Sequence, residues 1–121
     1  MDYELLIQQT NQLIKACEQA QARFFHMREI DREPNFFEEV KPYADDMRAQ
    51  IEQWRVQVYT FIDTEQPKYM HKVQIDNAID AMEQFFVQSF YKATSKKRFL
   101  QSIQAVQYTL DTLLRKIGAE Q

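Results

Sequence analysis

Apolar residues recur at every third or fourth position in four segments of the chain, at residues 6–27, 37–61, 75–86 and 99–117. This spacing places the apolar side chains on one face of an α-helix, whereas a half-buried strand would alternate them at every second position. The second stripe is counted from Phe37 and the first includes Cys17, so both side chains are expected in the core. The pattern predicts four amphipathic helices.

Local signals mark where these helices begin and end. Asn35, followed by Glu38 three positions later, is a capping-box pattern at the start of the second helix. Pro42 lies inside the second stripe and has no amide hydrogen, so we expect a kink or break near residue 42, or a short turn before the main helix. Ser95 is expected to cap the fourth helix, and Gly118, the only glycine, to end it. The helices are therefore predicted at about 3–30, 36–63, 68–93 and 96–117.

The composition supports an all-α fold. The 121 residues include one glycine and three prolines, too few for the frequent turns of a β-rich protein. A chain of this length fits one domain, so residues 1–121 are expected to form a single domain. Short connections between amphipathic helices make successive helices antiparallel. We therefore predict an antiparallel up-and-down four-helix bundle.

The charge and the longest apolar runs limit the partners. The net charge is −3, so the chain has no overall attraction for nucleic acid or for anionic membranes. Its apolar runs are only a few residues long, too short to span a bilayer. The segment "MDYELLIQQT" carries acids where a signal peptide needs bases, and a single cysteine cannot form an internal disulfide. We expect a cytoplasmic protein that does not enter the membrane, and nucleic acid is disfavoured as a partner.

The residues that usually carry catalysis are few and dispersed. His26 and His71 are expected at opposite ends of the bundle, because a helix of about twenty residues spans roughly 30 Å. They therefore cannot share a metal ion. Cys17 lies in the first core stripe, where a thiol is usually buried and unreactive. The sequence predicts no catalytic residue, no metal site and no cofactor.

One basic cluster, "YKATSKKRF" at residues 91–99, has two interpretations. It could dock an acidic partner or a nucleic-acid backbone, or it could be neutralised by the acids of residues 29–39 at the same end of the bundle. Aromatic residues near this end fall outside the inner stripes, as does Tyr108 further along the fourth helix. We hypothesise a protein-binding or self-association surface there. Its residues are Phe25, Tyr91, Lys96, Lys97 and Arg98.

The segment "QPKYMHKVQI", residues 66–75, also has two interpretations. As a helix start, either Pro67 opens the third helix or His71 caps it with Gln74 three positions later. As a binding site, the amides of the helix start and the nearby lysines would attract an anion or another small molecule. The residues of this possible anion site are Lys68, Tyr69, His71 and Lys72.

Four stretches together resemble the YppE-like family of small bacterial proteins of unknown function. They are "FFEEVKP" (36–42), "PKYMHKVQI" (67–75), "QSFYKATSKKRF" (88–99) and "VQYTL" (106–110). The resemblance runs from about residue 35 to the C-terminus and is looser in the first helix. It implies a four-helix bundle from Gram-positive bacteria and no known activity. The sequence departs from the family pattern at "KATS", where relatives have more histidine, which further disfavours a metal site.

Two functions follow as expectations. The first is a non-enzymatic protein-interaction or regulatory module, whose partner is an unidentified protein or a second copy of the chain. The alternative is a small-molecule or anion-binding protein that uses the segment Pro67–Gln74.

Overall fold

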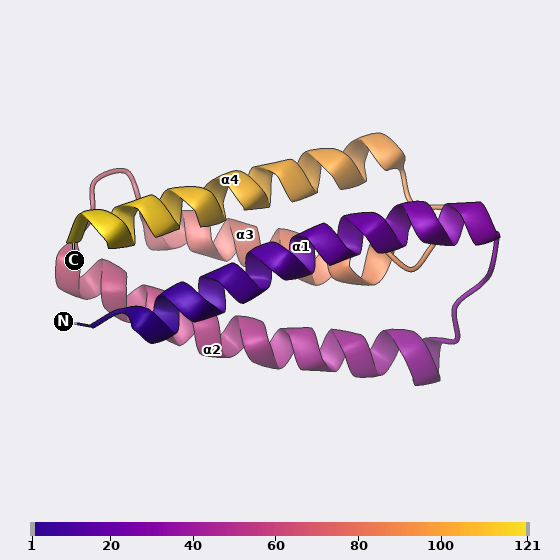
Figure 1. The fold of residues 1–121 in the computed structure, drawn as a ribbon, viewed down its shortest axis with the longest axis horizontal. Coiled ribbons are helices and arrows are strands. Elements are labelled where there is room, and N and C mark those ends of the chain that lie inside the picture. The colour runs from indigo at the N-terminus through magenta and orange to yellow at the C-terminus, as the bar shows by residue number, and fades with distance from the viewer. Residues whose placement is uncertain (1, 121) are drawn as a thin grey trace.

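The computed structural model describes residues 2–120 and contains four α-helices and one short π-helical turn (Figure 1). The helices are α1 (Glu4–Ile30), α2 (Lys41–Glu65), α3 (Lys72–Gln88) and α4 (Lys96–Glu120). The π-helical turn, η1 (Phe36–Val40), directly precedes α2. Residues 2–120 contain no strand, which confirms the predicted all-α fold. Within the same range, no helix is both long enough and apolar enough to cross a bilayer.

The chain reverses direction at each connection between helices, and both chain ends lie at the same end of the bundle (Figure 1). At each end of the bundle, one hydrogen bond joins residues that are more than sixty positions apart in the sequence. The hydroxyl of Tyr3 donates to Glu65 Oε1 at 2.6 Å, and Nη2 of Arg28 donates to the carbonyl of Thr94 at 2.5 Å. We call the end that holds both termini the terminal end. The end formed by residues 25–40 and 89–98 is the distal end.

The core is formed by the apolar stripes of all four helices. Trp54 of α2 is fully buried, and its indole N–H donates to Thr10 Oγ1 of α1 at 3.0 Å. The Thr10 hydroxyl in turn donates to the carbonyl of Leu6 at 2.7 Å. Nearer the distal end, the rings of Phe24 and Phe99 stack with their centroids 4.1 Å apart. Aromatic packing and one buried hydrogen-bond chain therefore join α1 to both α2 and α4.

Phe37 was expected in the core, but its side chain is 77% exposed, so that prediction is wrong. The reason is the π-helical turn, in which the amide of Val40 bonds to the carbonyl of Asn35 at 3.3 Å. This wider turn adds a residue before α2 and rotates Phe37 away from the core face, whereas Val40 is buried. Pro42 then lies in the first turn of α2, where its missing amide hydrogen costs no helical hydrogen bond.

The third helix is shorter than the predicted 68–93. At its start, Gln66 and Tyr69 have φ of 46° and 65°, a left-handed backbone that a right-handed helix cannot include. His71 is extended and forms the N-cap, the second of the two predicted arrangements. At its end, the Ser89 hydroxyl donates to the carbonyl of Phe86 at 2.7 Å, and a turn follows. The helix therefore covers only 72–88.

The fourth helix is longer than the predicted 96–117. Gly118 does not end it, because α4 continues to Glu120 and no described glycine has a positive φ. Ile117 is fully buried and anchors the last turn against the core. Residues 118–120 are exposed, so packing holds the helix as far as Ile117 and the glycine after it does not interrupt the last turn.

We expect Thr10→Val to lower the free energy of unfolding by about 1–3 kcal/mol, because the buried Trp54 N–H loses its only acceptor. Urea denaturation followed by tryptophan fluorescence measures this change. The matched control is Thr60→Val: Thr60 donates to the carbonyl of Val56 at 3.0 Å but is exposed. An equal loss in both variants would show that the buried bond is not the cause.

Candidate functional site

The basic residues at the distal end differ in how they are paired. The ammonium of Lys92 is hydrogen-bonded to Asp31 and lies 3.9 Å from a carboxylate oxygen of Glu33. The positive charge of Lys92 is therefore neutralised within the domain. For this residue, neutralisation by the acids of residues 29–39 is the correct interpretation of the basic cluster. This pairing also lowers the pKa of Asp31, first through the hydrogen bond from Lys92 and then through its charge.

The first turn of α4 carries three further cations that remain free. Lys96, Lys97 and Arg98 are exposed, and none of them forms an ion pair with any residue in the range 2–120. Positive side chains here oppose the positive end of the helix dipole. Three cations and one helix start therefore produce an uncompensated positive surface at the distal end.

Phe25 is the aromatic residue that joins this surface. Its side chain is 36% exposed, and the ammonium of Lys96 lies 5.6 Å from its ring centroid. Tyr91, the second predicted aromatic residue, lies in the connection that precedes α4. Its side chain is half-buried, and we do not include it in the surface. Tyr108 is 70% exposed but lies ten residues beyond Arg98, about 15 Å along α4, and is not part of the surface. We call Phe25, Lys96, Lys97 and Arg98 the basic surface.

Two arginines of α1, which the sequence reasoning missed, hold the connection 89–95 in place. Nε of Arg23 donates to Ser89 Oγ at 2.9 Å, and Arg28 donates to the connection through the bond to Thr94 given above. The guanidinium of Arg23 also lies over two rings, 4.3 Å from the centroid of Tyr43 and 4.4 Å from that of Phe90, and these rings meet edge to face. The connection thus positions the start of α4 rigidly against α1.

A second exposed cluster at the distal end was also missed. Ile30, Phe36 and Phe37 are all exposed, and the two phenylalanine rings meet edge to face with centroids 5.2 Å apart. The side-chain oxygen of Asn35 accepts a hydrogen bond from the amide of Glu38 at 3.0 Å. The sequence signal was the phenylalanine pair directly after the capping Asn35, at the first turn of a helix, where few residues are available to cover both rings.

At the terminal end, the residues of the possible anion site do not converge. Lys72 is paired with Asp63 at 2.7 Å, and its ammonium lies 5.0 Å from the ring centroid of Tyr59. Its charge is therefore neutralised within the domain. Tyr69 is 79% exposed, with the ammonium of Lys116 at 5.7 Å from its ring centroid.

His71 and Lys68 have different surroundings. His71 caps α3, and its amide donates to Gln74 Oε1 at 2.6 Å. Lys68 is exposed and forms no ion pair within residues 2–120.

A depression of about 360 Å³ nevertheless opens beside this segment. Its lining residues are Ile62, Asp63, Gln66, Pro67, Met70, His71 and Lys72. Two of the four predicted residues, His71 and Lys72, therefore face it, whereas Lys68 and Tyr69 are outside its lining. The carboxylate of Asp63 within the lining weakens any attraction for an anion.

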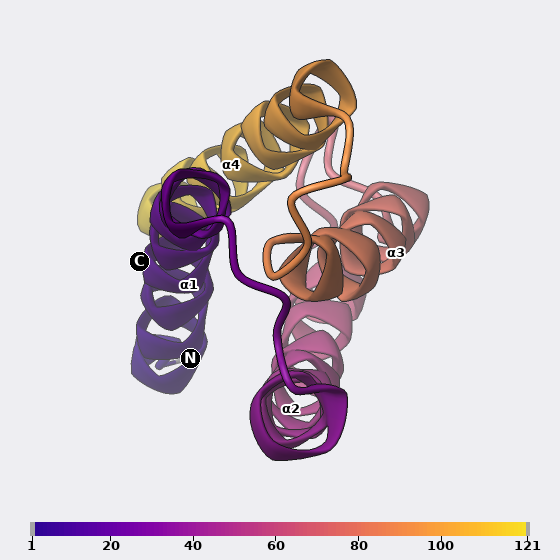
Figure 2. The same ribbon diagram turned by 90° about the vertical axis from the view of Figure 1, so that its right-hand side faces the viewer.

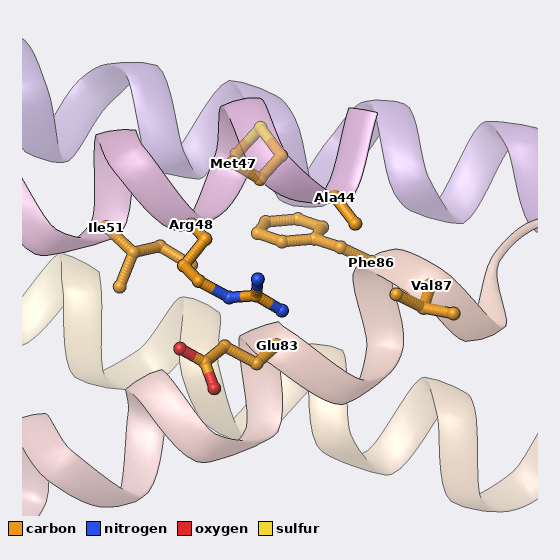
Figure 3. A pocket seen from close by; sticks show the side chains of 7 residues that line it. All are labelled: Ala44, Met47, Arg48, Ile51, Glu83, Phe86 and Val87. Atoms are coloured by element: carbon orange, nitrogen blue, oxygen red, sulfur yellow. The ribbon is translucent and has the colours of Figure 1, made fainter. Parts of the chain in front are cut away.

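The crease between α2 and α3 is too small for a ligand. Figure 3 shows the side chain of Arg48 of α2 extending toward Glu83 of α3, with Met47 and Phe86 above it in the view. Its volume is about 10 Å³, the space of a single water molecule.

Cys17 is fully buried, and burial raises the pKa of its thiol to about 12. At neutral pH the side chain is therefore a neutral thiol, which is a poor nucleophile and a poor metal ligand. Within residues 2–120, no three histidine, cysteine or acidic side chains lie close enough together to hold a metal ion.

Comparison with known proteins identifies relatives over nearly the whole chain. The profile of a bacterial domain of unknown function, DUF1798, matches residues 10–117. The chain is 28% identical to the uncharacterized protein YppE of Bacillus subtilis (strain 168), over 97% of this chain and 95% of that protein. The predicted family resemblance is confirmed. The match is wider than predicted, since it begins at residue 10, within α1.

Solved structures of similar proteins share the fold. The crystal structure of YppE from Bacillus subtilis superposes with a TM-score of 0.93, covering 99% of this chain and 98% of that one. A protein of unknown function from Listeria innocua, 26% identical, has a TM-score of 0.84 and covers 93% and 94% of the two chains. A DUF1798 domain from Staphylococcus aureus, 22% identical, has a TM-score of 0.88 and covers 97% and 99%.

We expect Lys92→Gln to raise the pKa of Asp31 toward the ordinary aspartate value of about 3.9, because the carboxylate loses its hydrogen bond and its cation. The pKa is lowered in the folded protein, so the pair stabilises the fold at neutral pH. That contribution is lost as the pH falls from the ordinary value through the lower folded value. Carboxyl ¹³C NMR titration measures the change.

Asp45 is the control for this titration, because its pKa is lowered by Lys41 instead and should not move. An Asp31 pKa that is the same in the wild type and in Lys92→Gln would contradict the pairing.

Proposed function

We propose that this chain, which belongs to the DUF1798 family of bacterial domains of unknown function, is a non-enzymatic protein-interaction module. Its basic surface binds an acidic segment of a protein partner. The observation that carries the proposal is the contrast between Lys92, which is paired within the domain, and the three cations of the first turn of α4, which are not.

Uncompensated charge supports an acidic partner. The amides at the start of α4 and the side chains of Lys96, Lys97 and Arg98 add their positive potentials over one turn of helix. A carboxylate placed there would gain attraction from all of them at once. Among residues 2–120 no carboxylate pairs with these three cations, whereas Asp31 and Glu33 pair with Lys92, which precedes α4.

The aromatic component supports a protein rather than a simple anion. Phe25 presents an apolar ring beside the ammonium of Lys96, so the surface offers both charge and apolar contact. Arg23 and Arg28 hold the neighbouring connection, so the backbone at the start of α4 needs little ordering on binding. Nucleic acid is disfavoured because the chain as a whole is acidic, with a net charge of −3.

A cytoplasmic location is part of the proposal. Cys17 is a free, buried thiol, a form that persists in a reducing compartment.

A random copolymer of glutamate and tyrosine is a suitable probe for this function. We expect wild-type protein to bind it at low salt by isothermal titration calorimetry, and to bind polyglutamate more weakly because that polymer lacks aromatic groups. The triple variant Lys96→Glu, Lys97→Glu, Arg98→Glu should lose at least tenfold in affinity, since complementary charges become repulsive. Circular dichroism confirms that the variants are folded.

The matched control is the triple variant Lys15→Glu, Lys68→Glu, Arg115→Glu. It changes three exposed cations elsewhere and has the same net charge as the first triple variant. Its affinity for the copolymer should stay within about twofold of the wild type, because the basic surface is intact. Equal losses in both triple variants would show that only net charge matters and would overturn the proposal.

The depression at the terminal end supports a second candidate, binding of a small anionic molecule. Its volume of about 360 Å³ lies at the lower end of the range of ligand sites. In this arrangement Lys72 and His71 would contact the ligand, and Asp63 would compete with it for Lys72.

Inorganic phosphate tests this candidate through the melting temperature. We expect millimolar phosphate to stabilise Asp63→Asn more than the wild type, because the substitution frees Lys72. Asp111→Asn, the same substitution at an exposed position of α4 that forms no ion pair within residues 2–120, is the control. The same phosphate response in all three proteins would rule out the site.

A further inference from the structure

We infer that the acidic segment bound by the basic surface is η1 of a second copy of this chain, so that two molecules associate through their distal ends. This inference rests on the proposed function and names the partner. The exposed cluster of Ile30, Phe36 and Phe37 around η1 is not part of the basic surface and has no role in the proposed function.

The η1 segment has the chemistry that the basic surface requires. Phe37 is the most exposed phenylalanine of residues 2–120, and Phe36 beside it is 48% exposed. Glu38 follows at once and, in contrast to Glu39, forms no ion pair within the same range. The segment therefore combines two apolar rings with a free carboxylate, a counterpart to Phe25 and the three cations of α4.

The segment is also held in a defined shape. Asn35 caps the turn at the amide of Glu38, and Glu39 accepts two hydrogen bonds from Arg32, at 2.9 and 3.1 Å. Glu39 also accepts a hydrogen bond from the amide of Asn35 at 2.7 Å. Because these bonds already fix the backbone, presenting Phe37 to a partner requires little further ordering.

The positions of the two surfaces permit a symmetric contact. Figure 2 looks onto the distal end and shows the start of α4 at one edge and the turn that begins α2 at the opposite edge. A twofold axis lying across this end, between the two edges, would place the start of α4 of each copy against η1 of the other. Each pairing would then occur twice, as in the isologous interfaces of homodimers.

The charge distribution at this end favours two copies. A single molecule carries both the basic surface and the free carboxylate of Glu38, at separate edges where they cannot pair with each other. Association brings them together and also covers the exposed rings of Phe25, Phe36 and Phe37. These side chains are only part of the 1,200–2,000 Å², roughly, that a stable interface buries. The dimer is therefore expected to depend on concentration and to weaken with salt.

Sedimentation equilibrium of the full chain at low salt, over a range of concentrations, tests the inference. We expect the wild type to approach the mass of a dimer. The variants Lys97→Glu/Arg98→Glu, Glu38→Lys and Phe37→Ser should each raise the dissociation constant by about tenfold or more. Tyr108→Ser, which alters an exposed aromatic residue of α4 outside the distal end, should leave it unchanged.

Mixing the two charge variants separates self-association from other causes. In an equimolar mixture of Lys97→Glu/Arg98→Glu with Glu38→Lys, one contact of the mixed dimer has its charges exchanged and the other is native. The mixture should therefore recover dimer that neither variant forms alone. A mixture that stays monomeric, or a wild type that is monomeric at every concentration, overturns the inference.

Dimerisation and binding of the copolymer are independent measurements. A monomeric wild type that still binds the glutamate–tyrosine copolymer through the basic surface would remove the second copy as the partner but leave the proposed function. A wild type that neither dimerises nor binds the copolymer would remove both.

Discussion

The guanidinium of Arg23 holds the elements of the distal end together. It lies over the ring of Tyr43, in the first turn of α2, and over the ring of Phe90, in the connection 89–95, and so joins both to α1. No carboxylate pairs with it in the described part of the chain, so stacking on two rings and the bond to Ser89 stabilise the charge. Its Nη2 is buried there without a hydrogen-bond partner, which makes the ring contacts the main compensation.

This arrangement links the core to the surface that we propose as functional. Arg23 and Arg28 both reach from α1 to the connection before α4, and Arg28 also lies over the ring of Phe24, which stacks on Phe99. The start of α4 is therefore positioned by buried contacts, although its own side chains are exposed. The backbone that carries the three cations is thus held against α1, which places them on one turn at one edge of the distal end.

Much of the fold could be predicted from the sequence, and the failures have a common cause. The four helices and their core faces follow from a spacing that repeats within each segment, and the buried Trp54 and Ile103 lie where that spacing places them. The start of α3 was wrong because it depends on the left-handed backbone at Gln66 and Tyr69, and the end of α4 was wrong because Gly118 remains helical. Phe37 was misplaced because a π-helical turn shifts the helical phase and has no clear signal in the spacing.

The candidate site was predicted only in part. Lys96, Lys97 and Arg98 stand out in the sequence as a basic run, but their difference from Lys92 does not. Lys92 is paired because Asp31, sixty-one residues away along the chain, lies beside it in the folded bundle. At the terminal end, Lys72 is likewise neutralised by Asp63.

The sequence by itself determined the fold class, the apolar faces of the helices and the family, because helical periodicity and family motifs are carried by residues close together in the chain. Only the tertiary structure decided which cations are free, which phenylalanines are exposed and how the distal end is held together. Those properties depend on distances between residues of different helices, and the pattern along one helix contains no information about them.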